Sequence, residues 1–230
     1  IFSFVARTKI LPKTSAPSIE DYKVFFAAQT KNGDEVVHFN ISSKASASHS
    51  CALAAAKEFD GKVRVVDSLA LSSGQGLLVM KAADLRDEGL SAEEIERRVN
   101  ALRLKVNTSF VPDRLDYLYK GGRCSRMEMY GANILKIHPM IDMKDGQLGV
   151  KKKYRGKMTV CIRAYIDDLK AAYPKYDKTR CFVTHSCADA ELVELAKERV
   201  RSEFDFREII ETVAGSVITG HCGRNTLGVL

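Results

Sequence analysis

The chain has 230 residues, of which 45% are hydrophobic and 28% are charged, and its formal net charge is +7. This balance is typical of a globular protein and excludes a disordered chain. The longest stretch without a charged side chain, Ser68 to Met80, is too short to cross a bilayer, so we expect no transmembrane helix and no signal peptide. Six cysteines lie far apart without paired spacing, which predicts reduced thiols and a cytoplasmic location.

Near the N-terminus, Ser18 and Asp21 predict a capping box at the start of a helix. Thr14 and Ser15 stand just upstream, on the irregular approach to that helix N-terminus. Helix N-termini tend to bind anions, so the two hydroxyls are candidate ligand contacts. Ordinary turn chemistry is the alternative interpretation.

From Glu35 to about Val111 the pattern alternates strands with helices. The strand candidates are "EVVHFNI" and "KVRVV"; the helix candidates are "CALAAAKEF", a segment starting near Leu77, and a segment capped by Ser91 and Glu94. This alternation predicts a parallel sheet covered by helices. The serine-rich loops 42–50 and 67–76 follow the two strands, where ligands bind in open sheets of this kind.

The second half predicts a mixed sheet with helices. Pro112 and Asp113 precede a short helix that Gly121 can end, and 144–146 is a strong hairpin signal. Amphipathic helices are predicted around 158–172 and 192–200, a strand at 180–185, and a closing strand, glycine-rich turn and strand over 209–230. We place the domain boundary between residues 107 and 108, giving domains 1–107 and 108–230.

The densest basic run, 151–157, lies on the predicted hairpin. A solvated hairpin is one interpretation, because lysines keep exposed strand edges from pairing, and a docking surface for another protein is the second. No nucleic-acid-binding motif accompanies the run.

Several enzyme and cofactor motifs are absent from the sequence. Gly74-Gln75-Gly76 lacks the third glycine of a dinucleotide fingerprint, and Gly121-Gly122-Arg123 lacks the spacing of a phosphate-binding loop. His185-Ser186-Cys187 and His221-Cys222 do not have zinc-site spacing. We therefore expect no cofactor and no metal.

What remains is a set of uncharged donors at helix N-termini and strand ends. They are Thr14, Ser15, the loop Ser42 to Ser48, the loop Ser68 to Ser73, and His221. Together they can bind a carboxylate through hydroxyl and amide hydrogen bonds. Neutral donors suit a ligand whose other end is apolar.

Five motifs carry a resemblance to a known family. "KTSAPS", "SSKASASHSCA", "VVDSLALSSGQGLLV", "FVPDRLDYLYKGGR" and "TGHCGRNTLGVL" occur in the order and at similar intervals to those of the DegV family of bacterial fatty-acid-binding proteins, across essentially the whole chain. The resemblance implies a two-domain α/β fold, with a mostly parallel sheet carrying helices on both faces and a second, mixed α/β domain.

The resemblance also implies a function without catalysis. Family members enclose a long-chain fatty acid, and some present its carboxylate to a separate dihydroxyacetone-kinase-like fatty acid kinase, which makes acyl phosphate for phospholipid synthesis. The expected partners are thus the fatty acid and the kinase subunit, with peripheral membrane contact for lipid exchange and no nucleic acid.

Position by position, the resemblance implies that Thr14 and Ser46 hold the carboxylate and that Ser15 shapes the turn. Arg123 and His221 are expected beside the carboxylate, where Arg123 orients the head group or meets the kinase.

Three features of the sequence depart from the family pattern. Ala45 and Ala47 replace the usual Leu and Gly, so that Ser48 is an alternative to Ser46, and Arg224-Asn225 adds a charge near His221. The family's opening strand with its Asp-Ser segment is not found, so we expect the chain to be truncated at its N-terminus, with an exposed sheet edge or a recruited partner chain.

Two other functions stay open at this point. One is an acyl hydrolase that uses Cys222, His221 or Ser46, although no G-x-S-x-G elbow is present. The other is a regulatory nucleic-acid-binding protein, which the net charge allows.

Overall fold

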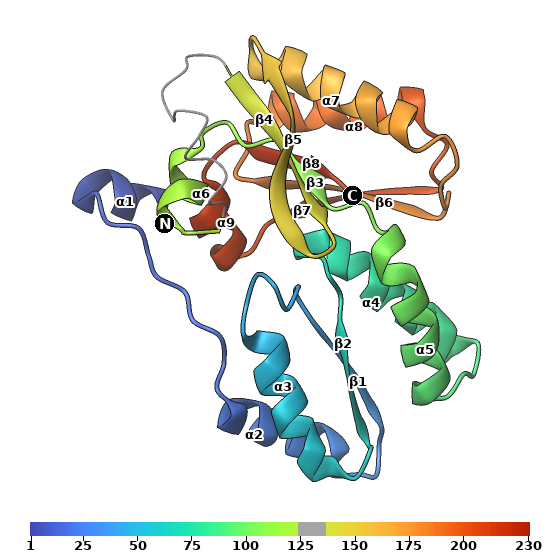
Figure 1. Cartoon of the computed structure of the whole chain (residues 1–230). Coiled ribbons are helices and arrows are strands. Elements are labelled where there is room, and N and C mark those ends of the chain that lie inside the picture. Colours follow the sequence, from blue (N-terminus) through green and yellow to red (C-terminus); the bar gives the residue numbers. More distant parts are fainter. Residues whose placement is uncertain (124–136) are drawn as a thin grey trace. The chain divides into compact units, whose positions relative to one another are not determined.

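A computed structural model describes residues 1–123 and 137–230 (Figure 1). The chain forms two compact units. The first unit comprises Thr14–Val106 with Met143–Gln147, and the second unit comprises Ile1–Lys13, Asn107–Asp142 and Leu148–Leu230. The domain boundary between residues 107 and 108 stays a prediction.

The first unit alternates helices with two strands. Its elements are α2 (Ile19–Thr30), β1 (Val36–Asn40), α3 (Ser48–Ala56), η1 (Lys57–Phe59), β2 (Val63–Asp67), α4 (Ser72–Asp87), α5 (Ala92–Leu102) and η2 (Arg103–Lys105). β1 and β2 pair in parallel, from Val36 opposite Val63 to Asn40 opposite Asp67. The predicted parallel α/β pattern is therefore confirmed.

Local signals in the sequence fix the ends of these helices. Ser18 and Asp21 form the predicted capping box at the start of α2, since each side chain bonds the other residue's backbone N–H. The Ser91 side chain accepts a hydrogen bond from the Glu94 N–H at the start of α5. Asp60, at φ 46°, follows the helical segment and ends it.

Helices cover both faces of the strand pair. The apolar cluster of α2 and α3 includes Phe26, which is fully buried, and packs against Val63 on one face. On the other face, Val66 packs with Val99 of α5 and Leu85 of α4. Burying each such side chain stabilises the fold by about 1.5–3 kcal/mol.

Helix α4 begins five residues before the predicted start near Leu77, so that expectation was wrong. Ser72 is its first residue, and the segment Gly74 to Gly76 lies within the helix instead of in a loop. Gly74 is buried. Tertiary packing at this position outweighs the low intrinsic helix propensity of glycine.

The second unit holds a larger set of elements. They are α1 (Phe2–Thr8), β3 (Ser109–Phe110), α6 (Asp116–Lys120), β4 (Ile137–Lys144), β5 (Gln147–Arg155), α7 (Met158–Ala172), β6 (Arg180–Ser186), α8 (Ala190–Glu203), β7 (Glu208–Val213), α9 (Ser216–Cys222) and β8 (Thr226–Val229); the ends of β4 and β5 at 143–147 belong to the first unit. One sheet has the order β3-β4-β5 and the other β7-β6-β8. Because β6 is parallel to β7 and antiparallel to β8, the predicted mixed sheet is confirmed.

The core of the second unit lies between α7, α8 and the β6 sheet. α7 and α8 pack side by side (Figure 1). Tyr165 of α7 is fully buried, and its hydroxyl bonds the Ser109 hydroxyl and accepts from the Val229 N–H. Burial raises the pKa of Tyr165, so the phenol stays neutral.

The predicted hairpin turn is present between β4 and β5. Asp145 and Gly146 both have positive φ, 50° and 81°, as a two-residue turn of this type requires. β5, which carries Lys151 and Lys152, is an outer strand of its sheet.

The predicted glycine-rich turn near the C-terminus contains a short helix, α9, which the sequence pattern missed. Among residues 1–123 and 137–230, no helix has the length and apolar character needed to span a membrane.

Candidate functional site

The two serine-rich loops of the first unit follow the carboxyl ends of β1 and β2, as predicted. Ser42 is fully buried, and its Oγ donates to the carbonyl of Gly146 at 2.6 Å. Its backbone N–H donates to the carbonyl of Ala70 in the other loop at 2.8 Å. Ser42 is thus a structural residue that holds the two loops and the turn around Gly146 together.

Asp67 organises the same region. Its Oδ1 accepts hydrogen bonds from the backbone N–H groups of Ser43 and Leu69, both at 3.1 Å. Burial alone would raise the pKa of Asp67, but the hydrogen bonds from Ser43 and Leu69 outweigh burial and hold that pKa below its ordinary value. Sequence reasoning missed this residue, although an acidic side chain at the carboxyl end of a parallel strand is a recognisable signal.

Ser46 lies at the entry to α3 and is half-buried. Its Oγ is 2.8 Å from the Oγ of Ser48 and accepts a hydrogen bond from the Ser48 N–H at 3.2 Å. The two hydroxyls that were alternatives for the carboxylate contact therefore form one pair. An anion bound there would meet both hydroxyls together with the start of a helix.

Thr14 and Ser15 lie on the irregular segment between α1 and α2, as expected. The Thr14 side chain is half-buried and Ser15 is exposed. The cap of α2 consists of hydrogen bonds between Ser18 and Asp21. Thr14, Ser15 and Ser46 all belong to the first unit.

Arg123 and His221 come together in the second unit, although 97 residues separate them. Arg123 Nη1 donates to the carbonyl of Gly121 at 2.8 Å. Gly121 in turn lies directly against the His221 ring, since a Cβ atom at position 121 would be 2.5 Å from Nδ1. Burial lowers the pKa of His221, and the positive charge of Arg123 lowers it further.

The contacts of α6 and α9 explain this arrangement. The two helices pack together, and Gly223, at the end of α9, lies so close to Tyr117 of α6 that a Cβ atom would be 2.9 Å from the ring. Gly223 also has φ 81°, which favours glycine. These glycines set the distance between the segment carrying Arg123 and the helix carrying His221.

The thiol of Cys222 does not suit nucleophilic catalysis. It is 4% exposed, and burial raises its pKa to about 12. A thiolate is the reactive form, and this environment disfavours it. Within residues 1–123 and 137–230, no group of three or more His, Cys, Asp or Glu side chains is arranged to hold a metal ion.

These features define a two-unit α/β protein in which polar loops follow the ends of parallel strands, the usual position of ligands in such sheets. The family model described as "Uncharacterised protein, DegV family" matches residues 1–230. The chain therefore belongs to the DegV family, and the resemblance seen in the five motifs is confirmed.

Relatives and solved structures agree with this assignment. A fatty acid-binding protein of Thermotoga maritima is 33% identical over 222 residues, which are 95% of this chain and 76% of that protein. A fatty-acid-binding DegV protein from Thermus thermophilus superposes with TM-score 0.89 at 30% identity, covering 100% of this chain and 81% of that one. A DegV lipid-binding protein from Thermotoga maritima gives TM-score 0.87 at 31% identity, covering 98% and 78%.

One further structure concerns a kinase system. The Fatty Acid Kinase B3 protein of Streptococcus pneumoniae, loaded with linoleic acid, superposes with TM-score 0.83 at 25% identity, covering 97% of this chain and 79% of that one.

Proposed function

We propose that this protein binds a long-chain fatty acid and that the side chains of Thr14 and Ser46 anchor its carboxylate. The observation that carries the proposal is the match of the whole chain to DegV structures described as fatty-acid-binding, at TM-score 0.89. Binding of an acyl chain is driven by burial of methylene groups, each worth about 0.8 kcal/mol. The hydroxyls then set the direction of the ligand.

The hydroxyl pair of the first unit supports the carboxylate assignment. Ser46 and Ser48 share a hydrogen bond of 2.8 Å, so one hydroxyl hydrogen remains for the ligand while the pair stays ordered. Hydrogen bonds to a charged group contribute about 1.5–3 kcal/mol each, which is enough to orient an acid whose affinity comes mainly from its tail. Ser15, which is exposed, shapes the turn that carries Thr14.

In the second unit, Arg123 and His221 are the proposed head-group residues. Since burial and Arg123 both lower the pKa of His221, the imidazole is neutral near pH 7 and offers one donor and one acceptor. Arg123 is exposed, and its guanidinium is proposed to contact the ligand head group or a partner.

We further propose that the protein presents the carboxylate to a separate fatty acid kinase and does not itself catalyse acyl phosphate formation. Support comes from the likeness to the Streptococcus pneumoniae Fatty Acid Kinase B3 protein. The basic run 151–157 is the proposed contact surface. Lys152 lies 2.6 Å from Asp168 and Lys151 lies 3.5 Å from Asp142, but both lysine side chains stay exposed, so their charges can still attract a partner.

Native mass spectrometry of the protein purified from bacteria tests the proposal directly. We expect a co-purified ligand whose mass is that of a free long-chain fatty acid, released unchanged on denaturation. A ligand-free protein that also fails to take up oleate or palmitate would contradict fatty-acid binding. Turnover of an acyl ester by the purified chain would favour the hydrolase instead.

A further inference from the structure

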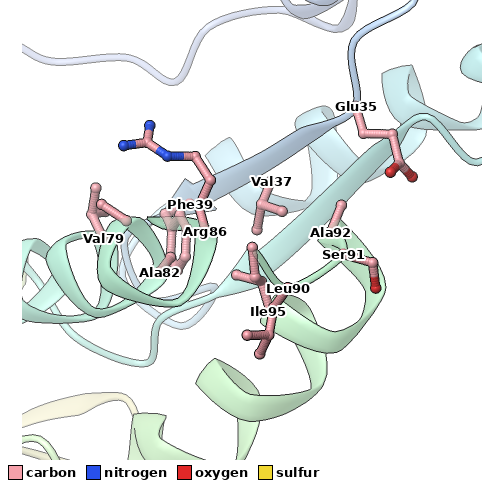
Figure 2. A pocket seen from close by; sticks show the side chains of 11 residues that line it. Glu35, Val37, Phe39, Val79, Ala82, Arg86, Leu90, Ser91, Ala92 and Ile95 are labelled. Carbon is pink, nitrogen blue, oxygen red and sulfur yellow. The ribbon is translucent and has the colours of Figure 1, made fainter. Parts of the chain in front are cut away.

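Buried polar side chains gather around the carboxyl end of β6, in the second unit. A groove of about 400 Å³ in the first unit, between β1, α4 and the start of α5, is by contrast lined mainly by apolar side chains (Figure 2). The buried polar side chains around the end of β6 are Thr184, His185, Ser186, Thr219 and Thr226. Thr219 donates to the Ala214 carbonyl at 3.0 Å, just before α9, and Thr226 donates to the last residue of α9 at 2.9 Å. Since buried polar groups are stable only when they are hydrogen-bonded, these bonds help to hold the helix that carries His221.

Helix α9 connects the two strands that flank β6. It follows β7 and precedes β8, and these strands pair with β6 on its two sides. α9 has only seven residues, and Gly215 at its N-cap gives no side-chain cap. A helix of this length is not stable in water by itself, so its neighbours must hold it. Whatever holds α9 therefore also holds the His221 imidazole.

Both ends of α9 are attached to the end of β6 by backbone hydrogen bonds. Before the helix, the Ala214 N–H donates to the His185 carbonyl at 2.9 Å. After the helix, the Asn225 N–H donates to the Ser186 carbonyl at 3.0 Å. The His185 ring shapes the loop that follows, since its Nδ1 accepts from the Ala188 N–H at 3.1 Å. The position of α9 thus depends on the loop between β6 and α8.

Asp189 adds side-chain hydrogen bonds to this attachment. It is the N-cap of α8, yet its side chain makes no cap hydrogen bond to that helix, although an aspartate at this position usually does. Its Oδ2 accepts from the Asn225 Nδ2 at 3.4 Å, and its backbone N–H donates to the Asn225 Oδ1 at 3.0 Å. Arg224 Nη2 lies 3.5 Å from the Asp189 Oδ1. Asp189 and Asn225 therefore bond each other twice.

The backbone of Asn225 also suits this pairing. Its φ of 57° is left-handed, a conformation that asparagine adopts more readily than most residues other than glycine. Glycine would adopt the same backbone with less strain, but it would lose both side-chain bonds to Asp189. Asparagine at this position thus combines the turn after α9 with a donor and an acceptor for the loop after β6.

We propose that Asp189 and Asn225 are positioning residues, which hold α9 so that the His221 ring stays against Gly121 in the segment that carries Arg123. This inference rests on the proposed function, because it assigns the pair to the fatty-acid head-group site. Helix α6 packs against α9 within the same unit (Figure 1). Breaking the pair lets α9 move relative to α6, and the imidazole moves with it.

Exchange of the two side chains in the whole 230-residue chain tests the pair. Asn225→Asp removes the amide donor and places two carboxylates together, so the NMR signals of the His221 ring should shift and the Kd for oleate should rise about fivefold. Adding Asp189→Asn should restore both, because the amide then stands at position 189 and the carboxylate at position 225. Asn225→Gly should also shift the signals and weaken binding, and it does so without backbone strain.

Glu191→Gln is the matched control, because it removes one negative charge from the first turn of α8 and leaves the pair intact. It should change neither the His221 signals nor the Kd, and melting temperatures show that each variant is folded. Unchanged His221 signals in both Asn225 variants, or an exchanged pair that does not restore them, would overturn the proposal. If the wild type bound no oleate, the proposed function would fail, and signals that shift and are restored by exchange would still support the positioning of His221.

Discussion

Gly121 and His221 are in direct contact, because a side-chain carbon at position 121 would lie only 2.5 Å from Nδ1 of the imidazole. Carbon atoms do not approach a ring nitrogen that closely without displacement. The position of the His221 ring therefore depends on the absence of a side chain at Gly121, in the same segment that carries Arg123.

Gly121→Ala should displace the His221 ring and weaken fatty-acid binding by about 1–2 kcal/mol. The backbone at Gly121 has φ −73°, which alanine adopts freely, so the effect reports the side-chain contact and not backbone strain. Titration calorimetry with oleate measures the affinity, and NMR of the His221 ring reports its displacement. Gly149→Ala is the control, because nothing lies within 4 Å of a Cβ atom there. Equal affinities for the two variants would remove His221 from the head-group site.

Replacing both proposed carboxylate anchors, Thr14→Ala with Ser46→Ala, should weaken fatty-acid binding by about 1–3 kcal/mol, since donors to a charged group are lost. Fluorescent fatty-acid displacement measures the change. Ser50→Ala is a suitable control because Ser50 is exposed and donates to the carbonyl of Ala47 at the start of the same helix. An unchanged affinity in the double variant would refute the carboxylate assignment.

Reversing the charges of Lys151, Lys152 and Lys153 should slow association with a fatty acid kinase and leave lipid affinity unchanged. Opposite charges across an interface mainly raise the association rate, and that gain falls with salt. Stopped-flow association at low and high salt measures the effect. Thermal melting must accompany it, because Lys152 also pairs with Asp168. If the association rate stays constant, the hairpin is a solvated edge only.

The lowered pKa of Asp67 predicts that the stability of the protein decreases in acid. Its pKa is lower in the folded protein than in the unfolded chain, so the stability it contributes is present above about pH 4 and is lost as the pH falls through the folded value. The side chain is partly exposed, so we expect its charge to contribute less than about 1 kcal/mol to the free energy of unfolding. Urea unfolding of the wild type and of Asp67→Asn measures it. Their difference in the free energy of unfolding should shrink below about pH 4; a constant difference would show that the charge of Asp67 has no role.

Thiol alkylation should modify exposed cysteines faster than buried ones. Cys187 is exposed, whereas Cys222 and Cys181 are buried, with pKa values raised to about 12. Iodoacetamide at neutral pH should modify Cys187 in the native protein and reach the other two only after unfolding, as peptide mapping can show. Rapid native alkylation of Cys222 would reopen the hydrolase interpretation.

The sequence alone determined much of the local structure. The Ser18 box, the Ser91 cap, the turn at Asp145 and Gly146 and the amphipathic helix α7 are fixed by residues close together in the chain, so their signals are readable without a fold. The family motifs likewise lie within short segments, which is why the family was predicted correctly.

Other features were decided only by the tertiary structure. The start of α4 at Ser72 and the helix α9 depend on packing against distant segments, which outweighs local propensity. The meeting of Arg123 with His221 and the bond between Ser42 and Gly146 join residues about a hundred positions apart. No periodicity encodes such contacts, because chain folding and close packing bring these residues together and local sequence preference does not.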